Sequence, residues 1–250
     1  MPEPRKPSEG SAFPLLVELI GPAGSGKTSA AGAVAQRLQQ KGLNILAHED
    51  FRKEDLRRGG RYLQKSSALP RIVRILRLAA QRPVFAACVY LAGIMLGPPF
   101  GTRFYYGTRA LGQLGMLVRL RREASFDVVL IDEGVVNILW SMTVGAPRLR
   151  GARLVRIALA AYARDSEARG VTMSCDGVRL AERAFSRSAP SRFSLHAGPD
   201  QRTDFPKWLG YHDELVAMLP KGFIVSSVDA TQGPEDVQAS LQRTLEKLIA

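Results

Sequence analysis

The sequence predicts a three-layer α/β fold in which helices cover both faces of a five-stranded parallel sheet. Short apolar runs of five or six residues alternate with longer stretches of helical periodicity. This alternation is typical of parallel strands joined by right-handed helical crossovers. A chain of 250 residues, with 46% hydrophobic and 23% charged residues, can bury a substantial core, which excludes a disordered, collagen-like or coiled-coil protein. The expected strands are 15–20, 43–47, 127–132, 171–175 and 223–228.

The helices are predicted from the apolar positions between these strands. In the first of them, Ala30, Val34 and Leu38 fall on one face, and Gly42 lies where a C-terminal cap belongs. The terminal helix has Pro234 at its start, a position that favours proline. The expected helices are 27–40, a basic helix around 71–79, an apolar stretch at 84–96, 102–123, 135–142, 151–169, 178–187, 204–219 and 234–249.

The domain organisation is expected to be simple. Residues 1–12 are polar, rich in Pro and Glu, and lack the apolar region of a secretory signal, so we expect a flexible tail. Residues 13–250 are expected to form one domain, with a helical insertion at about 56–124 between the second and third strands. The two cysteines, Cys88 and Cys175, form no CxxC pair, which favours a reducing cytoplasm over a disulfide scaffold or a zinc ribbon.

One motif carries a specific chemistry. Residues 21–28 read GPAGSGKT and fit G-x-x-x-x-G-K-[ST] between an expected strand and an expected helix. Glycines let the backbone wrap closely around phosphate oxygens, and the successive amides at a helix N-terminus carry partial positive charge. In such a P-loop, Lys27 reaches the β- and γ-phosphates of ATP and the Thr28 hydroxyl holds Mg²⁺. The expected phosphate-binding residues are Gly21, Ala23, Gly24, Ser25, Gly26, Lys27, Thr28 and Ser29.

Acidic residues follow the second and third expected strands. Asp132 ends the third strand, where it would hold Mg²⁺ together with Thr28, or would cap the following helix. Glu133 would activate water in an ATPase, or would serve as a substrate ligand or a surface residue. Glu49 lies just past the second strand, at the sheet edge where ligands bind in open α/β folds. It would accept a proton from an acceptor hydroxyl or hold a sugar, or it would pair with the basic residues that follow it.

These motifs resemble those of P-loop kinases in the thymidylate kinase and nucleoside monophosphate kinase group. The resemblance covers about residues 14–50 and 125–249 and includes, besides the P-loop, the triplet Asp-Glu-Gly at 132–134 and the segment Ser-Val-Asp-Ala-Thr at 227–231. Thymidylate kinases usually have Asp-Arg-Tyr where this chain has Asp-Glu-Gly. The resemblance therefore implies a kinase that uses ATP and Mg²⁺, and it leaves the phosphate acceptor open.

The resemblance also implies a lid at about 178–203. The segment 177–187, GVRLAERAFSR, is similar to the entry of the lid in those kinases. Arg183, Arg187 and Arg192 would close over the transferring phosphoryl group, where positioned positive charge does most of the catalytic work. Because Arg183 and Arg187 are four residues apart, they share a helix face, and a solvated face is the alternative.

The positive charge of the chain is concentrated in its middle. Between residues 57 and 122 there are 13 basic residues and no acidic one, so a net charge of +12 leaves 12 − 13 = −1 for the remainder. This distribution predicts an anionic acceptor or an anionic surface, with a solvated face as the alternative. The apolar stretch 84–96 falls short of the roughly 20 residues that span a bilayer. We expect it to pack into the core, with the arginines facing substrate phosphates, or to lie in a membrane interface.

The sequence thus predicts an ATP- and Mg²⁺-dependent phosphotransferase that acts in the cytoplasm on a small anionic acceptor, such as a nucleoside monophosphate. Two alternative functions stay open: a P-loop ATPase in a regulatory or assembly role, and a kinase for a sugar or lipid-linked acceptor at an anionic membrane surface. The oligomeric state is also open, and a homodimer is one expectation. The N-K-x-D motif of GTPases is absent, and few aromatics interleave the basic segment, so GTP and nucleic acid are not expected partners. Trp140 and Trp208 are expected to be packing residues, and no histidine has metal-ligand spacing.

Overall fold

A parallel sheet of five strands lies at the centre of the computed structural model, which describes residues 13–47, 68–122, 126–186 and 201–250. The strands are β1 (Leu15–Ile20), β2 (Ile45–Leu46), β3 (Val128–Ile131), β4 (Arg169–Ser174) and β5 (Ile224–Asp229). Their order is β2-β3-β1-β4-β5, and every neighbouring pair is parallel. The predicted sheet is therefore confirmed.

The edge strand β2 is shorter than the sequence predicted. Only Ile45 and Leu46 pair with β3. Just before them, Asn44 exchanges hydrogen bonds with Asp127: the Asn44 amide donates to the Asp127 carboxylate at 2.7 Å, and the Asp127 amide donates to the Asn44 carbonyl at 2.8 Å. These loop contacts replace the first rung of the strand ladder, so the strand begins two residues late.

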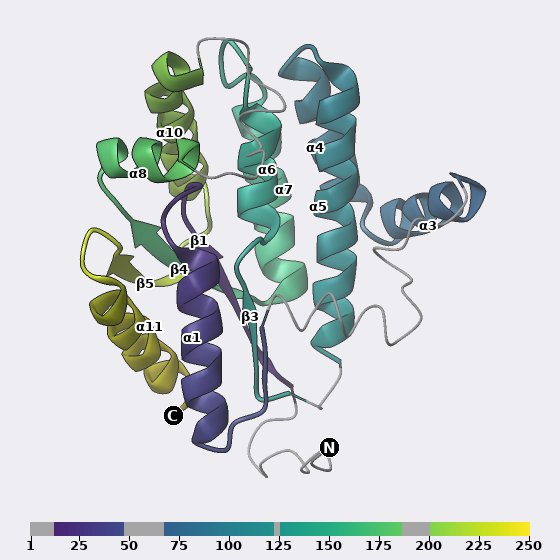
Figure 1. Cartoon of the computed structure of the whole chain (residues 1–250). Coiled ribbons are helices and arrows are strands. Elements are labelled where there is room, and N and C mark those ends of the chain that lie inside the picture. Colours follow the sequence, from purple (N-terminus) through teal and green to yellow (C-terminus); the bar gives the residue numbers. More distant parts are fainter. Residues whose placement is uncertain (1–12, 48–67, 123–125, 187–200) are drawn as a thin grey trace.

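The helices agree with the predicted pattern to within a few residues at their ends (Figure 1). Three of them lie between β2 and β3 in the chain, which confirms the predicted helical insertion. Figure 1 shows α3 standing away from the other helices, while α4 and α5 run side by side. The helices are α1 (Lys27–Gln40), α3 (Ala68–Gln81), α4 (Pro83–Met95), α5 (Phe100–Leu120), α6 (Val135–Thr143), α7 (Ala152–Ser166), α8 (Gly177–Phe185), α10 (Gln201–Ala217) and α11 (Pro234–Ile249).

The two faces of the sheet bury different sets of helices. Because side chains alternate along a strand, Val17 and Leu19 of β1 join a core cluster with α1 and α11, whereas Leu16 and Ile20 face the other layer. That second layer contains α4, α5, α6, α7, α8 and α10. The arrangement is the three-layer α/β fold that the sequence predicted.

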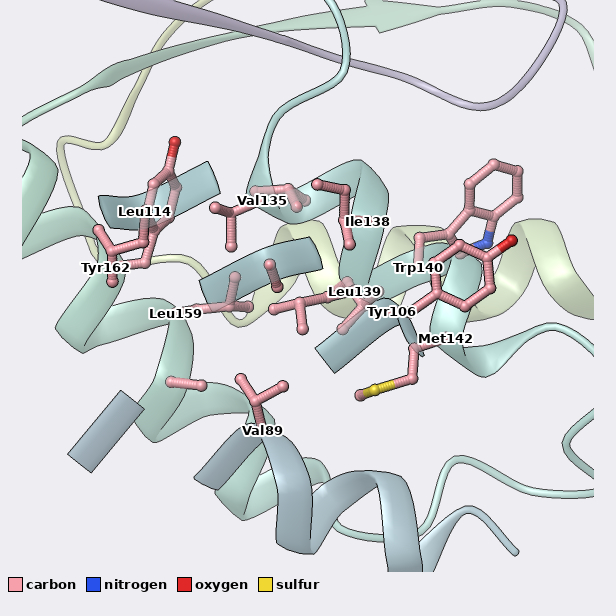
Figure 2. Packing of buried hydrophobic residues seen from close by; sticks show 14 of the residues in the cluster. Val89, Tyr106, Leu114, Val135, Ile138, Leu139, Trp140, Met142, Leu159 and Tyr162 are labelled. Carbon is pink, nitrogen blue, oxygen red and sulfur yellow. The ribbon is translucent and has the colours of Figure 1, made fainter. Parts of the chain in front are cut away.

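Helix α6 forms the centre of the larger core. All nine of its residues are buried, and Figure 2 shows Val135, Ile138 and Leu139 of α6 among side chains from α5 and α7. Trp140 donates its indole N–H to the carbonyl of Trp208 at 2.7 Å, so both tryptophans are packing residues, as expected. A helix buried on all sides fixes the position of the segment that precedes it, and that segment is part of the site.

The insertion helices pack into this core on one side only. On α4, Phe85, Val89 and Ala92 are buried, whereas Leu91 and Ile94 are about half exposed. The prediction that residues 84–96 pack into the core is thus right for one face of the helix and wrong for the other. Among the described residues, no single helix is both long and apolar enough to cross a membrane, although the bent pair Ile75–Gln81 and Pro83–Met95 would pass that test together.

Several arginines of the basic segment bind the protein itself. The guanidinium of Arg103 is buried and donates to the carbonyls of Met142 and Val144 at the C-terminal end of α6, the second at 2.7 Å. Arg82 pairs with Asp165 of α7 at 3.4 Å. The expectation that these arginines face substrate phosphates is therefore wrong for Arg82 and Arg103, since helix-end carbonyls and a neighbouring carboxylate engage them.

Candidate functional site

The loop between β1 and α1 has the backbone shape that phosphate binding requires. Gly24 and Gly26 adopt positive φ values of 91° and 81°, which residues with side chains rarely adopt. Gly26 is also the N-cap of α1, so the first amides of that helix point into the loop. Residues 21–28 therefore form the P-loop that the motif predicted, at the carboxyl edge of the sheet.

Two side chains of the motif face the loop and its neighbour strand. The Lys27 ammonium donates to the carbonyls of Gly21 and Pro22 at 2.6 and 2.8 Å, which holds it across the mouth of the loop. The Thr28 hydroxyl donates to the Asp132 carboxylate at 2.6 Å. Asp132 is buried at the end of β3, so the strand brings it to the P-loop across 104 residues of sequence.

Thr28 and Asp132 fit a magnesium ion. Both offer oxygen atoms, and Mg²⁺ in nucleotide sites is usually held by one or two such protein groups while phosphates and waters complete its shell. Within the described residues, no group of three or more His, Cys, Asp and Glu side chains could hold a metal ion by itself. The site therefore suits a metal that arrives with a polyphosphate.

Asn137 of α6 links the P-loop to the metal-site strand. Its side-chain amide donates to the carbonyls of Leu19 at 3.0 Å and Asp132 at 3.4 Å, and its carbonyl oxygen accepts from the Gly21 amide at 3.4 Å. Asn137 is buried, so these contacts satisfy a polar side chain inside the core. The residue thereby fixes the relative positions of β1, β3 and the start of the P-loop.

A buried carboxylate holds the N-terminus of α6, the helix that carries Asn137. Glu18 of β1 has no exposed surface; it accepts hydrogen bonds from the Val136 amide at 2.9 Å and from the Tyr162 hydroxyl. It caps the N-terminus of α6 from another strand, where a carboxylate is favoured. Burial nonetheless raises the pKa of Glu18 to about 7 and raises that of Tyr162 well above its usual value.

The second acid of the triplet contacts the insertion. Glu133 pairs with Arg109 of α5 at 3.1 Å, and the Arg109 guanidinium lies 5.8 Å from the centre of the Tyr105 ring, one turn earlier on the same helix. Arg109 is one of the thirteen basic residues between residues 57 and 122, and no motif in the sequence distinguishes it from the other twelve. The pair brings one guanidinium of that segment to the metal-site triplet.

Helix α8 closes the other side of the P-loop. A Cβ atom on Gly24 would lie 2.9 Å from the Leu180 carbonyl and 3.3 Å from the Cβ of Arg183, so the helix and the loop are in direct contact. Arg183 and Arg179 donate to the carbonyls of Ala230 and Thr231 beyond β5, at 3.4 and 2.8 Å. Together these elements enclose a cleft of about 430 Å³. Its lining includes Gly24, Ser25, Gly26, Ser29, Arg183, Ala230 and Gln232.

The predicted site residues divide into two groups. Residues 21–29 form the P-loop and the start of α1, Asp132 contacts Thr28, and Arg183 lines the cleft beside the loop. Glu133 follows Asp132 and pairs with Arg109. Glu49, Arg187 and Arg192 lie outside the described residues, as does most of the predicted lid. Of the predicted lid, residues 178–185 belong to α8 against the P-loop, and residues 201–203 belong to the start of α10.

Sequence reasoning missed Glu18, Asn137 and Tyr162. For Glu18, the available signal was a charged residue inside the otherwise apolar run LLVELI, which is expected to be buried on both faces of a parallel sheet. For Asn137 the only signal was one amide in the apolar run VVNILW. Tyr162 gave none, because an aromatic residue on an amphipathic helix is usually a packing residue.

Comparisons with known proteins add little to this geometry. No protein-family model and no curated protein matches the chain. Among solved structures, the chain is similar to shikimate kinase from Bacteroides thetaiotaomicron, with 14% identity, a TM-score of 0.46, and coverage of 94% of this chain and 99% of that one. It is also similar to shikimate kinase from Acinetobacter baumannii, with 13% identity, a TM-score of 0.45, and coverage of 95% of this chain and 94% of that one. The similarity to TT1252 from Thermus thermophilus has 14% identity, a TM-score of 0.43, and coverage of 94% of this chain and 98% of that one.

These values are too low to carry an argument about activity. The class of protein is instead defined by the parallel sheet, the P-loop between β1 and α1, and the acid at the end of β3. The chain has a P-loop NTPase fold.

Proposed function

We propose that the chain is an ATP- and Mg²⁺-dependent phosphotransferase with a small anionic acceptor. The observation that carries the proposal is the hydrogen bond between Thr28 and Asp132 beside the P-loop, at 2.6 Å. These two groups would supply the protein oxygen donors of a metal site on the edge of the loop. Thr28 and Asp132 would hold a Mg²⁺ ion, and such an ion would supply positive charge that neutralises the charge developing during transfer.

The remaining residues of the site bind and orient. The P-loop amides and Lys27 would hold the β- and γ-phosphates, and the cleft beside Ala230 and Gln232 would take the rest of the nucleotide. Transfer breaks the bond between the γ-phosphorus and its bridging oxygen, which leaves with ADP, and forms a bond to the acceptor oxygen; a hydroxyl acceptor would release its proton to solvent, whereas an ionised phosphate has none to lose. The Arg183 guanidinium lines this cleft and would stabilise the charge on the moving phosphoryl group.

The acceptor side is assigned from Arg109. Its guanidinium engages a carboxylate, Glu133, at the end of β3, and the planar fork of arginine also suits phosphate or carboxylate groups of a substrate. A nucleoside monophosphate satisfies this chemistry, and so does any other small phosphate or carboxylate. We assign the acceptor no further than that.

The second candidate function is an ATPase, and the acidic pair Asp132-Glu133 after β3 is the observation that favours it. In that case Glu133 would orient the attacking water. The two functions differ in what limits turnover. A kinase hydrolyses little ATP without its acceptor, whereas an ATPase turns over alone.

Radiolabelled γ-phosphate separates the two functions. A thermal-shift screen first selects the compounds that bind, from a panel of nucleoside monophosphates, sugar phosphates and lipid-linked phosphates. We expect the full chain alone to release negligible inorganic phosphate and to transfer the label to one of the selected compounds. Glu133→Gln should leave slow hydrolysis unchanged. Rapid acceptor-independent hydrolysis that Glu133→Gln abolishes would establish the ATPase instead.

A further inference from the structure

Exposed apolar side chains gather at one end of the insertion. Of the thirteen large hydrophobic residues that are exposed in the described part of the chain, nine lie on α3, α4 and the start of α5, each between 44% and 63% exposed. Six of these form what we call the tip patch, at the connection between α4 and α5. They are Leu91, Ile94, Met95, Phe100, Phe104 and Tyr105.

The tip patch is continuous across two helices. Leu91, Ile94 and Met95 are three and four residues apart, so they share one face of α4, and Phe100 and Phe104 share one face of α5. The rings of Tyr90 and Phe104 stack at 5.6 Å between their centres and join the two helices. Monomeric proteins rarely expose a large contiguous apolar patch unless it binds something.

Arginines border the tip patch on the side of α7. Arg148, Arg150, Arg153 and Arg156 are all exposed, and none of the four forms an ion pair with any residue the structure describes. We call them the arginine rim. The rim is adjacent to the patch because a Cβ atom on Gly151, in the middle of the rim, would lie 3.4 Å from the Ala92 Cα and 3.5 Å from the Met95 Cβ.

The charge around the tip patch is of one sign over long stretches of sequence. There is no acidic residue from 57 to 122, and none between Glu133 and Asp165, a stretch that includes the whole arginine rim. The opposite face of α4 packs into the core through Phe85, Val89 and Ala92. The protein therefore offers one exposed apolar face with a cationic border, while the rest of the helix is held in the domain.

From these observations we propose that the tip patch and the arginine rim dock the protein peripherally on an anionic lipid membrane. Aromatic and aliphatic side chains enter the boundary between headgroups and acyl chains, and arginines bind the anionic headgroups around them. A second copy of the chain is a poorer occupant, because it would bring a second arginine rim against the first. An anionic bilayer complements both the apolar patch and its border.

The position of the patch suits the site. In Figure 1 the α4–α5 connection and the loop between β1 and α1 lie toward the same end of the sheet, the end at which β1 finishes. Along α5, Phe100 in the patch and Arg109 at the site are nine residues apart, or about 13 Å. Docking would therefore hold the site close to the headgroup layer. The docking proposal itself does not depend on the proposed phosphotransferase activity.

Vesicle co-sedimentation of the full chain tests the proposal. We expect sedimentation with vesicles of phosphatidylcholine and phosphatidylglycerol at low salt, weaker sedimentation at high salt, and little with phosphatidylcholine alone. Replacing the four rim arginines by Gln should lower the partition coefficient on the order of 1,000-fold, at about 1 kcal/mol per arginine. The matched control replaces four exposed basic residues of other helices and loops, Lys207, Lys221, Arg243 and Lys247, by Gln, and should retain most of the binding.

A fluorescence measurement tests the apolar half without removing any core contact. Trp140 and Trp208 are buried, so Phe100→Trp should add an emission that shifts to the blue on addition of anionic vesicles, whereas Val178→Trp, at an exposed position on α8, should add one that does not shift. Absence of both sedimentation and shift at low salt would overturn the proposal. Equal vesicle binding by the wild type and the rim variant would also overturn it. A third contrary result would be a protein that binds no vesicles and forms a dimer, if the double variant Ile94→Ser and Phe100→Ser is monomeric.

Discussion

The buried carboxylate of Glu18 occupies the space that a side chain at Gly134 would need. A Cβ atom on Gly134 would lie 2.1 Å from the Glu18 Cδ and 2.3 Å from its Oε1. Glu18 cannot easily move aside, because the Val136 amide and the Tyr162 hydroxyl hold it. The third position of the Asp-Glu-Gly triplet is thus glycine for a steric reason that lies on another strand.

Gly134→Ala should therefore destabilise the protein, by about 2 kcal/mol, as overpacking of a core does. The measurement is urea unfolding. Gly112→Ala is the matched control, because a Cβ atom there meets nothing within 4 Å and α5 should gain from alanine. Glu18→Ala in the Gly134→Ala background should cost less than the sum of the two single changes, and strict additivity would show that the two residues do not compete for space.

Glu18 also predicts how stability depends on pH. Its pKa is raised by burial from 4.5 to about 7 in the folded state, so between those values the folded chain holds a proton that the unfolded chain has lost. The free energy of unfolding should therefore fall as the pH rises through this window, by up to about 3 kcal/mol. Urea titrations at several pH values across the window measure the slope. Glu18→Gln should remove this pH dependence, whereas Glu235→Gln, at an exposed position on α11, should keep it. Equal slopes of unfolding free energy against pH in the wild type and Glu18→Gln would show that Glu18 is not the group responsible.

Lys27→Ala should abolish phosphoryl transfer while leaving the fold intact. The Lys27 ammonium donates to the Gly21 and Pro22 carbonyls and to the Ser25 hydroxyl. The side chain is only partly buried, so its loss should open no cavity in the core, whereas the positive charge that would face the β- and γ-phosphates is removed. Lys41→Ala is the control, since Lys41 is exposed and pairs with Glu246 on the surface. Activity is measured by γ-phosphate transfer and folding by circular dichroism. Normal turnover by a folded Lys27→Ala protein would remove the P-loop from the mechanism.

Thr28→Ala and Asp132→Asn should act on the same metal ion. Each should raise the Mg²⁺ concentration needed for half-maximal activity by roughly tenfold or more, and the double variant should show less than the product of the two effects, because both groups serve one site. Titration of activity with Mg²⁺ measures this. If Asp132→Asn kept the Mg²⁺ dependence of the wild type, Asp132 would be a capping residue only.

Arg183→Gln should lower kcat more than it raises KM for ATP. The guanidinium borders the cleft beside Gly24 and Ser25, and its charge matters most when the phosphoryl group moves. Steady-state kinetics with saturating acceptor separate the two parameters. Arg243→Gln on the exposed side of α11 should change neither, and an effect of Arg183→Gln on KM alone would assign Arg183 to ground-state binding.

How far the sequence predicted this structure depends on the range of the interactions. The P-loop was predictable because its glycines, Lys27 and Thr28 act within eight consecutive residues, and the strand that ends in Asp132 was predictable from four apolar residues in a row. The partner of Glu18 was not, since Tyr162 and Val136 reach it only through the packing of α6 and α7 on β1. Nor does an apolar helix such as α4 reveal from its sequence which of its faces the core will cover.

Arg103 holds the C-terminal end of α6 against the insertion. The N-terminus of α6 adjoins the Asp132–Gly134 triplet, and its C-terminal carbonyls are bound by Arg103, three residues from Phe100. The helix is nine residues long, or about 13 Å, and buried throughout. It therefore acts as a spacer of fixed length between the P-loop end of the molecule and the outer end of the α4–α5 hairpin, so the distance between these two ends is constant.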